Sequence, residues 1–336
     1  MSPAAPAKTP NTPRIGLIGL GMYVPKKVVT NADIEKMVET TDEWIRSRTG
    51  IQERRIAEPG TTTSDLAFEA AREALQNAKL DPKDLDLIIV ATTTPDMLFP
   101  SVSCLIQQKL GAKSAACFDL SAACSGSVYA MITAQQYLLT GRYKNALVIG
   151  AEVLSNFIDW TDRSTCILFG DGAGACVMAP VSRGGILATD MGADGSAAEL
   201  LYMPGGGSKY PPSHQSVDQR LHFLRMNGSE VFKVAVRGMA DSAQRVIKDS
   251  GISREDIECF IPHQANTRII EAVAKWAELP MEKVFMNLQR YGNTSAASNL
   301  IALYEAVRDG VIKKNDHVVL VAFGAGLTWG SILLQW

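Results

Sequence analysis

The sequence lacks the features that would tie it to a membrane or to nucleic acid. No apolar run reaches the ~18 residues that a bilayer-spanning helix needs, and 33 basic residues stand against 35 acidic ones. There is no long run of Lys or Arg either, so neither a nucleic-acid nor a membrane partner is expected. The first residues, MSPAAPAKTPNTP, lack the apolar centre of a signal peptide, and we expect residues 1–13 to form a disordered lead-in.

The cysteines form no C-x-x-C pair. They are scattered along the chain, at Cys104, Cys117, Cys124, Cys166, Cys176 and Cys259. Such spacing indicates neither a disulfide framework nor a zinc site. We therefore expect no bound metal and a reducing, cytoplasmic location.

Two Gly-rich stretches resemble cofactor motifs but are incomplete. IGLIGLG at 15–21 has Val24 in place of the third glycine of a dinucleotide fingerprint, and no helix pattern follows it. FGDGAG at 169–174 lacks the Lys-Ser/Thr pair of a phosphate loop. No permanently bound cofactor is expected.

The chain is instead weakly self-similar. Amphipathic helix patterns at 64–78 and 229–250 are each followed by a similar acidic stretch that runs into a strand. Alternating helices and strands predict an α/β fold with largely parallel sheets covered by helices. We expect two pseudo-duplicated halves, 14–182 and 183–336, packed as two sheets around shared central helices.

Cys124 and Asn293 occupy similar places in the two halves. Each precedes a predicted helix that ends at a glycine, Gly141 or Gly310. Because the two starting residues and the two glycines are separated by the same number of positions, we expect Cys124 and Asn293 to be equivalent and close together.

Polar residues gather where predicted strands end. Cys124, His263 and the loop 324–326 each follow a strand, and Asn293 comes shortly after a predicted strand at 284–287. In parallel sheets, ligands bind beyond the carboxyl ends of the strands. Each feature also has a plain structural explanation, as a buried thiol, a hydrogen-bonding ring, a helix cap or a turn. Their convergence on one edge favours a functional site.

Cys124 carries the chemistry at this edge. A cysteine at the amide end of a helix faces unpaired N–H groups and the positive end of the helix dipole. That setting lowers a thiol pKa and favours a thiolate nucleophile near neutral pH.

Five motifs resemble those of the beta-ketoacyl-acyl-carrier-protein synthase III family, and the resemblance runs from about Arg14 to the end of the chain. They are TDEWIRSRTGI (41–51), DLSAACSG (119–126), PHQAN (262–266), YGNTS (291–295) and FGAGLTWG (323–330). The resemblance implies a thiolase-like fold, with two related halves in a five-layer αβαβα sandwich, and a homodimer. It also implies the initiation of type II fatty acid synthesis, in which a short acyl-CoA is condensed with malonyl-acyl carrier protein.

The resemblance assigns roles to the convergent residues. Cys124 would accept the acyl group, and His263 with Asn293 would donate hydrogen bonds to the enolate left by decarboxylation. The backbone N–H groups of Cys124 and Ala325 would form the oxyanion hole. Many relatives carry glycine in place of Ala325, which matters only where φ is positive.

Substrate contacts also follow from the resemblance. Trp44 and Arg163 resemble a pair that sandwiches the CoA adenine, with Arg48 nearby for phosphate, and Phe99 resembles a residue that lines the acyl pocket across the dimer interface. The residues expected to bind the carrier protein are Gln264, Ala265, Asn266, Thr267, Arg268, Lys233 and Lys275.

Other functions are less well supported. A polyketide or secondary-metabolite starter enzyme of the same fold could share Cys, His and Asn, whereas an elongating synthase usually has a second His and a thiolase a second Cys. A papain-like hydrolase uses Cys, His and Asn in this chain order, but the self-similar α/β pattern argues against it. A non-catalytic acyl-CoA-binding or carrier-protein-binding protein is disfavoured because all three polar residues are present.

Overall fold

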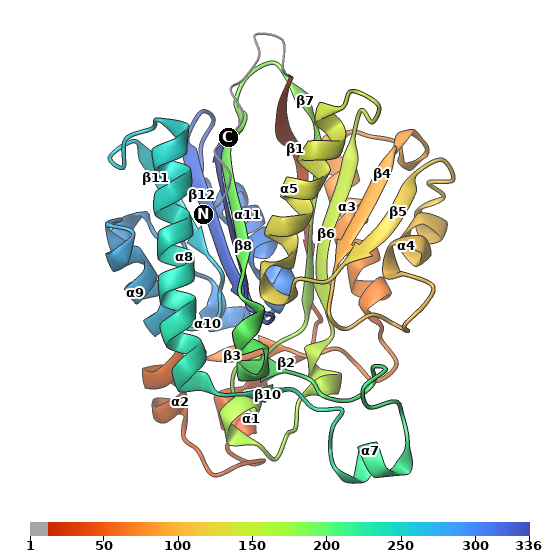
Figure 1. Cartoon of the computed structure of the whole chain (residues 1–336), viewed down its shortest axis with the longest axis vertical. Helices are drawn as coiled ribbons and strands as arrows, with labels where there is room; N and C mark the ends of the chain where they lie inside the picture. Colours follow the sequence, from red (N-terminus) through yellow and green to blue (C-terminus); the bar gives the residue numbers. More distant parts are fainter. Residues whose placement is uncertain (1–12) are drawn as a thin grey trace.

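Two β-sheets form the framework of the chain (Figure 1). The computed structural model describes residues 13–336, so the predicted lead-in at 1–13 lies, except for Pro13, outside the described residues. The first sheet has the strand order β1-β7-β6-β4-β5, with bounds Arg14–Tyr23, Gly172–Val181, Ala146–Glu152, Leu87–Ala91 and Ala116–Leu120. The second has the order β11-β12-β13-β8, with bounds Ile257–Pro262, His317–Gly324, Thr328–Gln335 and Gly185–Ala193.

Helices fill the space between the sheets and cover both outer faces (Figure 1). The central layer is α5 and α11, the first sheet is covered by α3 and α4, and the second by α8 and α9. Their bounds, in that order, are Gly126–Leu139, Ser298–Arg308, Thr63–Ala78, Val102–Leu110, Gly228–Ser250 and Thr267–Trp276. The expected α/β fold with a five-layer αβαβα sandwich is confirmed.

The composition of the helices explains their layers. Helix α5 is apolar almost all round and buries Val128, Met131 and Leu138, as a helix packed between two sheets must. Helices α3 and α8 are amphipathic and bury one face only, against the sheet that each covers. The central helices therefore belong to one core shared by both sheets.

The expectation of largely parallel sheets is wrong. In the first sheet β4 pairs in parallel with β5 and β6, but β7 runs antiparallel to both β6 and β1. The second sheet repeats this, since β12 is parallel to β11 and β13 is antiparallel to β12 and β8. The strands β12 and β13 are joined by a tight turn, and an antiparallel pair needs no crossover helix. A predicted strand at 284–287 is reduced to a single parallel bridge between Val284 and Phe260.

Short elements gather at one end of the two sheets (Figure 1). They are β2 Val28–Thr30, α1 Asn31–Ile34, α2 Asp42–Thr49, β3 Glu53–Arg55, α6 Arg163–Cys166, β9 Leu201–Tyr202, α7 His214–Asp218, β10 Arg225–Met226 and α10 Leu288–Tyr291. Turns of 3-10 helix complete the chain: η1 Pro82–Asp84, η2 Ala123–Ser125, η3 Leu154–Phe157, η4 Gly195–Leu200, η5 Met281–Lys283 and η6 Ser295–Ala297. Across residues 13–336, none of the helices has both the length and the apolar character needed to cross a bilayer.

Candidate active site

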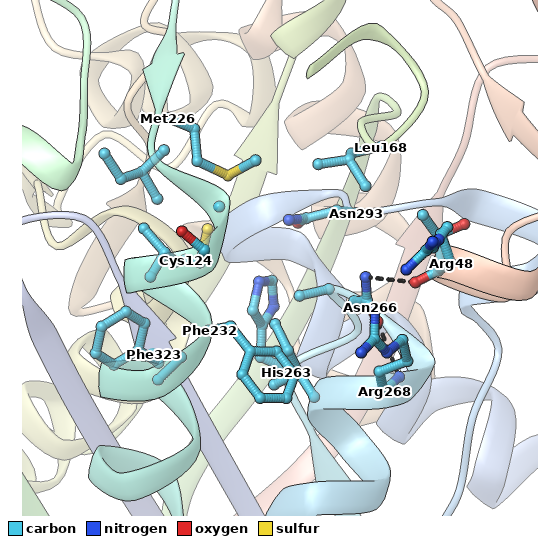
Figure 2. Close-up of a pocket in the computed structure, with 18 of the residues that line it drawn as sticks. Arg48, Cys124, Leu168, Met226, Phe232, His263, Asn266, Arg268, Asn293 and Phe323 are labelled. Carbon is cyan, nitrogen blue, oxygen red and sulfur yellow. Dashed lines mark hydrogen bonds between the residues drawn. The ribbon is translucent and has the colours of Figure 1, made fainter. Parts of the chain in front are cut away.

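A cavity of about 650 Å³ opens between α2, α8 and the strand ends. Cys124, His263 and Asn293 line it and are all buried, whereas Arg48 and Arg268, which also line it, are exposed. Figure 2 shows the first three side chains converging on one space, with the two arginines to one side. The cavity thus leads from a basic entrance to a buried polar end.

Cys124 lies in a strained turn that begins the central layer. It is the middle residue of η2, between β5 and α5. Ala123 before it has φ +46°, which a non-glycine residue adopts only at a cost of about 1–3 kcal/mol. The turn brings the thiol to the buried end of the cavity.

The thiol is not the resting thiolate that its place before a helix predicts. Burial raises the pKa of Cys124 to about 12, and the nearby charge of Glu152 acts in the same direction, although a hydrogen bond with Ser295 opposes it. Desolvation therefore outweighs the helix end. The thiol must lose its proton during acylation, so the site needs a proton acceptor.

The turn between β12 and β13 packs closely against the turn that carries Cys124 and is hydrogen-bonded to it. A Cβ atom on Gly324 would lie 2.7 Å from both the Ala122 oxygen and the Cys124 nitrogen. The Thr328 hydroxyl donates to the Ala122 oxygen at 3.0 Å and accepts from the Ser125 hydroxyl at 2.8 Å. Ala325 follows Gly324 directly and does not have a positive φ, so an alanine there is unstrained. The proposed oxyanion residues are therefore neighbours in space.

His263 presents one ring nitrogen to the cavity. Its Nδ1 lies 2.6 Å from the Ser298 hydroxyl, the first residue of α11, and that oxygen already accepts the Gln264 N–H at 3.4 Å. The hydroxyl proton is thus available to Nδ1, which favours the tautomer with its proton on Nε2. Burial lowers the pKa of His263 to about 3, so the ring is neutral at physiological pH.

Asn293 is oriented by its own turn. Its Oδ1 accepts the Ser295 N–H at 2.8 Å, and its backbone pairs with Leu168 and Gly170 at 2.8 and 3.0 Å. With the amide oxygen occupied, the Nδ2 group points toward Cys124 (Figure 2). Two neutral donors, from His263 and Asn293, therefore face the thiol.

Asn293 is near Cys124, but the two residues are not equivalent. The turn η6 repeats η2: each has a non-glycine residue with positive φ and leads directly into a central helix. Matching Ala123 with Ser295 pairs Cys124 with Ala296. The equal spacing in the sequence is misleading because α5 is 14 residues long and α11 only 11.

The aromatic and basic residues predicted to hold CoA lie together at the entrance. Arg163 lies over the Trp44 ring, 4.8 Å from its centroid, and donates to the Glu39 oxygen at 3.1 Å. Trp44 and Arg48 both lie on α2 and line the cavity. A ring can enter between Trp44 and Arg163 only if the two separate.

The predicted carrier-protein segment needs one correction. Gln264 is only 1% exposed, and its side-chain amide donates to the Pro262 oxygen at 2.7 Å and accepts from the Asn287 N–H at 2.9 Å. It braces the loop from inside and has no surface to offer a partner. Ala265, Asn266, Thr267 and Arg268 are at least partly accessible, and Lys233 and Lys275 are exposed.

Phe99 is not in the cavity of this chain. It is 84% exposed and lies beside Leu98 in the segment between β4 and α4. Its predicted place in an acyl pocket would require a second copy of the chain.

No sequence motif indicates the buried carboxylate that lies behind the nucleophile. Glu152, at the end of β6, accepts hydrogen bonds from Thr92, Thr93, Thr94 and the Ser295 hydroxyl. Its hydroxyl partners come from distant segments, and no single motif contains them. Among residues 13–336 no group of His, Cys, Asp and Glu could hold a metal ion.

Comparison with known proteins decides the family. Models of the two parts of 3-oxoacyl-[acyl-carrier-protein (ACP)] synthase III match residues 118–195 and, for the C-terminal part, 247–336. The beta-ketoacyl-[acyl-carrier-protein] synthase III of Caldanaerobacter subterraneus subsp. tengcongensis is 57% identical over 322 residues, 96% of this chain and 97% of that protein. The chain belongs to the beta-ketoacyl-acyl-carrier-protein synthase III family.

Solved structures of this synthase family and its relatives share the fold. The 3-oxoacyl-[acyl-carrier-protein] synthase III of Aquifex aeolicus is 50% identical, with a TM-score of 0.90 over 96% of this chain and all of that one. The priming beta-ketosynthase of the R1128 polyketide pathway is 34% identical, with a TM-score of 0.90 over 98% of both chains. The thiolase-like fold is therefore established, and the chain is a condensing acyltransferase.

Proposed function

We propose that this synthase condenses a short acyl-CoA with malonyl-acyl carrier protein through an acyl-Cys124 intermediate, and so initiates type II fatty acid synthesis. The observation that carries the proposal is the convergence of one thiol and two neutral hydrogen-bond donors in a single cavity. A papain-like hydrolase would need a basic His beside its Cys. A neutral donor suits an enolate instead.

Acylation comes first. The Cys124 sulfur bonds to the acyl carbon, the bond from that carbon to the CoA sulfur breaks, and CoA leaves. The N–H groups of Cys124 and Ala325 stabilise the negative oxygen of the tetrahedral intermediate. Covalent catalysis divides the condensation into two easier steps.

Decarboxylation and condensation follow. Malonyl-acyl carrier protein loses CO₂, and the negative charge that forms on its thioester oxygen is met by Nε2–H of His263 and the Asn293 amide. The enolate carbon then bonds to the acyl carbon, and the Cys124 sulfur departs. The products are beta-ketoacyl-acyl carrier protein, CO₂ and CoA, and these steps need no resident cofactor.

The entrance supports binding of both substrates. Trp44 and Arg163 would open to hold the adenine, while Arg48 meets phosphate. Arg268, Lys233 and Lys275 are exposed cations that suit an acidic carrier protein, with Ala265, Asn266 and Thr267 beside them. Gln264 lies inside the protein and supports the loop before α9 through its hydrogen bonds to Pro262 and Asn287.

A fatty acid role is favoured over polyketide priming. Identity is 57% and 50% with two fatty acid-type synthases but 34% with the polyketide priming enzyme. A panel of acyl-CoAs of different length and branching measures which primer the cavity accepts.

We also propose a homodimer in a reducing cytoplasm. Strand β5 is an unpaired, partly exposed edge, and Leu98 and Phe99 lie nearby as exposed apolar residues. All six cysteines are free thiols. Within each subunit we place the boundary of the halves at 182/183, between the end of β7 and the start of β8.

Mass spectrometry of the intact protein tests the function. With acetyl-CoA we expect the mass of one acetyl group to be added. Malonyl-acyl carrier protein should then remove the acetyl adduct, with release of CO₂ and formation of acetoacetyl-carrier protein. Cys124→Ala should take up no acetyl group. An adduct that persists in Cys124→Ala, or wild-type protein that stays unmodified, would refute the mechanism.

A further inference from the structure

Glu152 is a fully buried carboxylate surrounded by hydroxyl groups. Thr94 Oγ1 donates to it at 2.6 Å, Thr92 Oγ1 at 3.2 Å, and both the N–H and the hydroxyl of Thr93 lie within 3.3 Å. A hydroxyl can rotate to donate or accept, so this shell can serve a carboxylate or a protonated carboxyl. The site is built to tolerate a change of protonation at Glu152.

Ser295 connects this carboxylate to the reacting groups. Its hydroxyl donates to Glu152 Oε1 at 3.1 Å, and its N–H holds the Asn293 amide oxygen at 2.8 Å. The turns η2 and η6 pack against each other, which places Ser295 beside Cys124, and its hydroxyl acts to lower the pKa of the thiol. Ser295 has φ +48°, a left-handed conformation that is costly for serine. A conformation of this kind persists where the surrounding structure requires it. Here it places Ser295 next to Glu152, Cys124 and Asn293 at once.

We propose that Glu152, acting through the Ser295 hydroxyl, takes the Cys124 proton during acylation and returns it when the product forms. This inference rests on the proposed function of the site. As the Cys124 sulfur bonds to the acyl carbon, its proton moves to Ser295 Oγ, and the Ser295 proton moves to Glu152 Oε1. The bond to the CoA sulfur breaks, and CoA leaves as a thiolate that water protonates outside the cavity.

The second half of the cycle reverses the transfer. When the enolate carbon bonds to the acyl carbon, the Cys124 sulfur leaves as a thiolate and takes back the proton from Glu152 through Ser295. During decarboxylation Glu152 is therefore neutral. This matters because the malonyl carboxylate and then the enolate bring negative charge into the same buried space, and a second buried anion would oppose them.

The electrostatics of the resting site agree with this route. Burial raises the pKa of the Glu152 carboxyl, which makes it a better base than an exposed carboxylate. The groups that face it are the hydroxyls and amide of the segment after β4, the Ser295 hydroxyl of η6 and the Cys124 thiol of η2. His263 is a poor alternative base, since burial lowers its pKa to about 3.

The pH dependence of acylation tests the proposal. Rapid-quench mass spectrometry would follow acetyl transfer from acetyl-CoA to the wild type, Glu152→Gln and Ser295→Ala between about pH 6 and 9. We expect the wild-type rate to level off once Glu152 is ionised. Both variants should be about 10²-fold slower at pH 7, with a rate that rises about tenfold per pH unit because hydroxide must now remove the proton.

Glu73→Gln is the matched control. Glu73 lies on α3, away from the cavity, and is a half-buried carboxylate that accepts hydrogen bonds from the Tyr304 hydroxyl and the Met22 N–H. This variant should keep the wild-type profile. A Glu152→Gln variant with the wild-type rate and profile, or one slowed by the same factor at every pH, would overturn the proposal and leave the function intact. Failure of the wild type to acylate would instead refute the function.

Discussion

His263 and Asn293 act as hydrogen-bond donors because each has its other polar atom occupied. The Ser298 hydroxyl meets Nδ1 of His263, and the Ser295 N–H meets Oδ1 of Asn293. Each side chain is thereby fixed with a donor toward the thiol. Preorganised donors in a buried site stabilise developing charge far better than mobile water does.

Removing one donor should separate the two half-reactions. Asn293→Ala should acylate Cys124 at close to the wild-type rate but slow decarboxylation about 10²–10³-fold, since only the second step builds charge on the malonyl thioester. Quenched-flow detection of the acyl adduct and release of labelled CO₂ from malonyl-carrier protein measure the two steps. An equal loss in both steps would show that Asn293 supports the turn and not the enolate.

At this scale the sequence predicted what lies in short contiguous motifs. Cys124, His263 and Asn293 each lie within a short motif, and the structure brings the three side chains to one cavity. The cavity lies between the two sheets, since Cys124 follows β5 of the first sheet and His263 follows β11 of the second. The Glu152 network was not predictable, because its partners come from separate segments. The raised pKa of Cys124 was missed because burial depends on the whole fold.

At the scale of elements, the β12–β13 turn holds the active site together. Gly324 lets the backbone approach the nucleophile turn, and Thr328 bonds to it. Helix α9 contributes in a different way, by presenting Arg268 at the entrance while Gln264 anchors the preceding loop inside the protein. Adjacent residues in these turns therefore have opposite tolerance to substitution.

Two neighbouring substitutions test this contrast. Gly324→Ala should slow acylation about 10²-fold, because its Cβ would meet the Cys124 nitrogen at 2.7 Å and displace the nucleophile turn. Ala325→Gly should leave the acylation rate nearly unchanged and cost about 0.5–1 kcal/mol of unfolding free energy, through added backbone freedom. Acetyl-adduct kinetics and urea denaturation measure the two effects. Comparable kinetic losses in both variants would contradict the geometry.

The order of helices and strands was predictable, but their direction was not. The patterns at 64–78 and 229–250 correspond closely to α3 and α8. Burial patterns do not record whether adjacent strands run parallel or antiparallel, so β7 and β13 were assigned the wrong direction. The three-residue difference between α5 and α11 likewise hid which residues are equivalent.

At the scale of the whole molecule, one surface segment exposes two consecutive large apolar residues. Leu98 and Phe99 are 79% and 84% exposed and lie in the segment that leads into α4, whose Val102 N–H donates to Asp119 on the edge strand β5. An apolar segment beside an unpaired edge strand is typical of a surface that a second copy covers. The proposed acyl pocket is incomplete without that copy.

A charge in this segment should dissociate the proposed dimer. We expect the wild type to have a native mass near twice its 36.2 kDa, and Leu98→Glu to shift toward one subunit with loss of condensation. Light scattering after gel filtration measures the mass. Val217→Glu, at a residue 57% exposed on α7, is the matched control and should leave the mass unchanged. A wild type with the mass of one subunit would contradict the dimer.

The pairing of η2 with η6 also suggests a history for the chain. If both halves descend from one ancestral segment, then Ala296 in the second half occupies the position that corresponds to the attacking Cys124 in the first. The second copy has given up the nucleophile and supplies His263 and Asn293 in its place. The N-terminal half thus supplies the attacking thiol, and the C-terminal half supplies the two donors that face it.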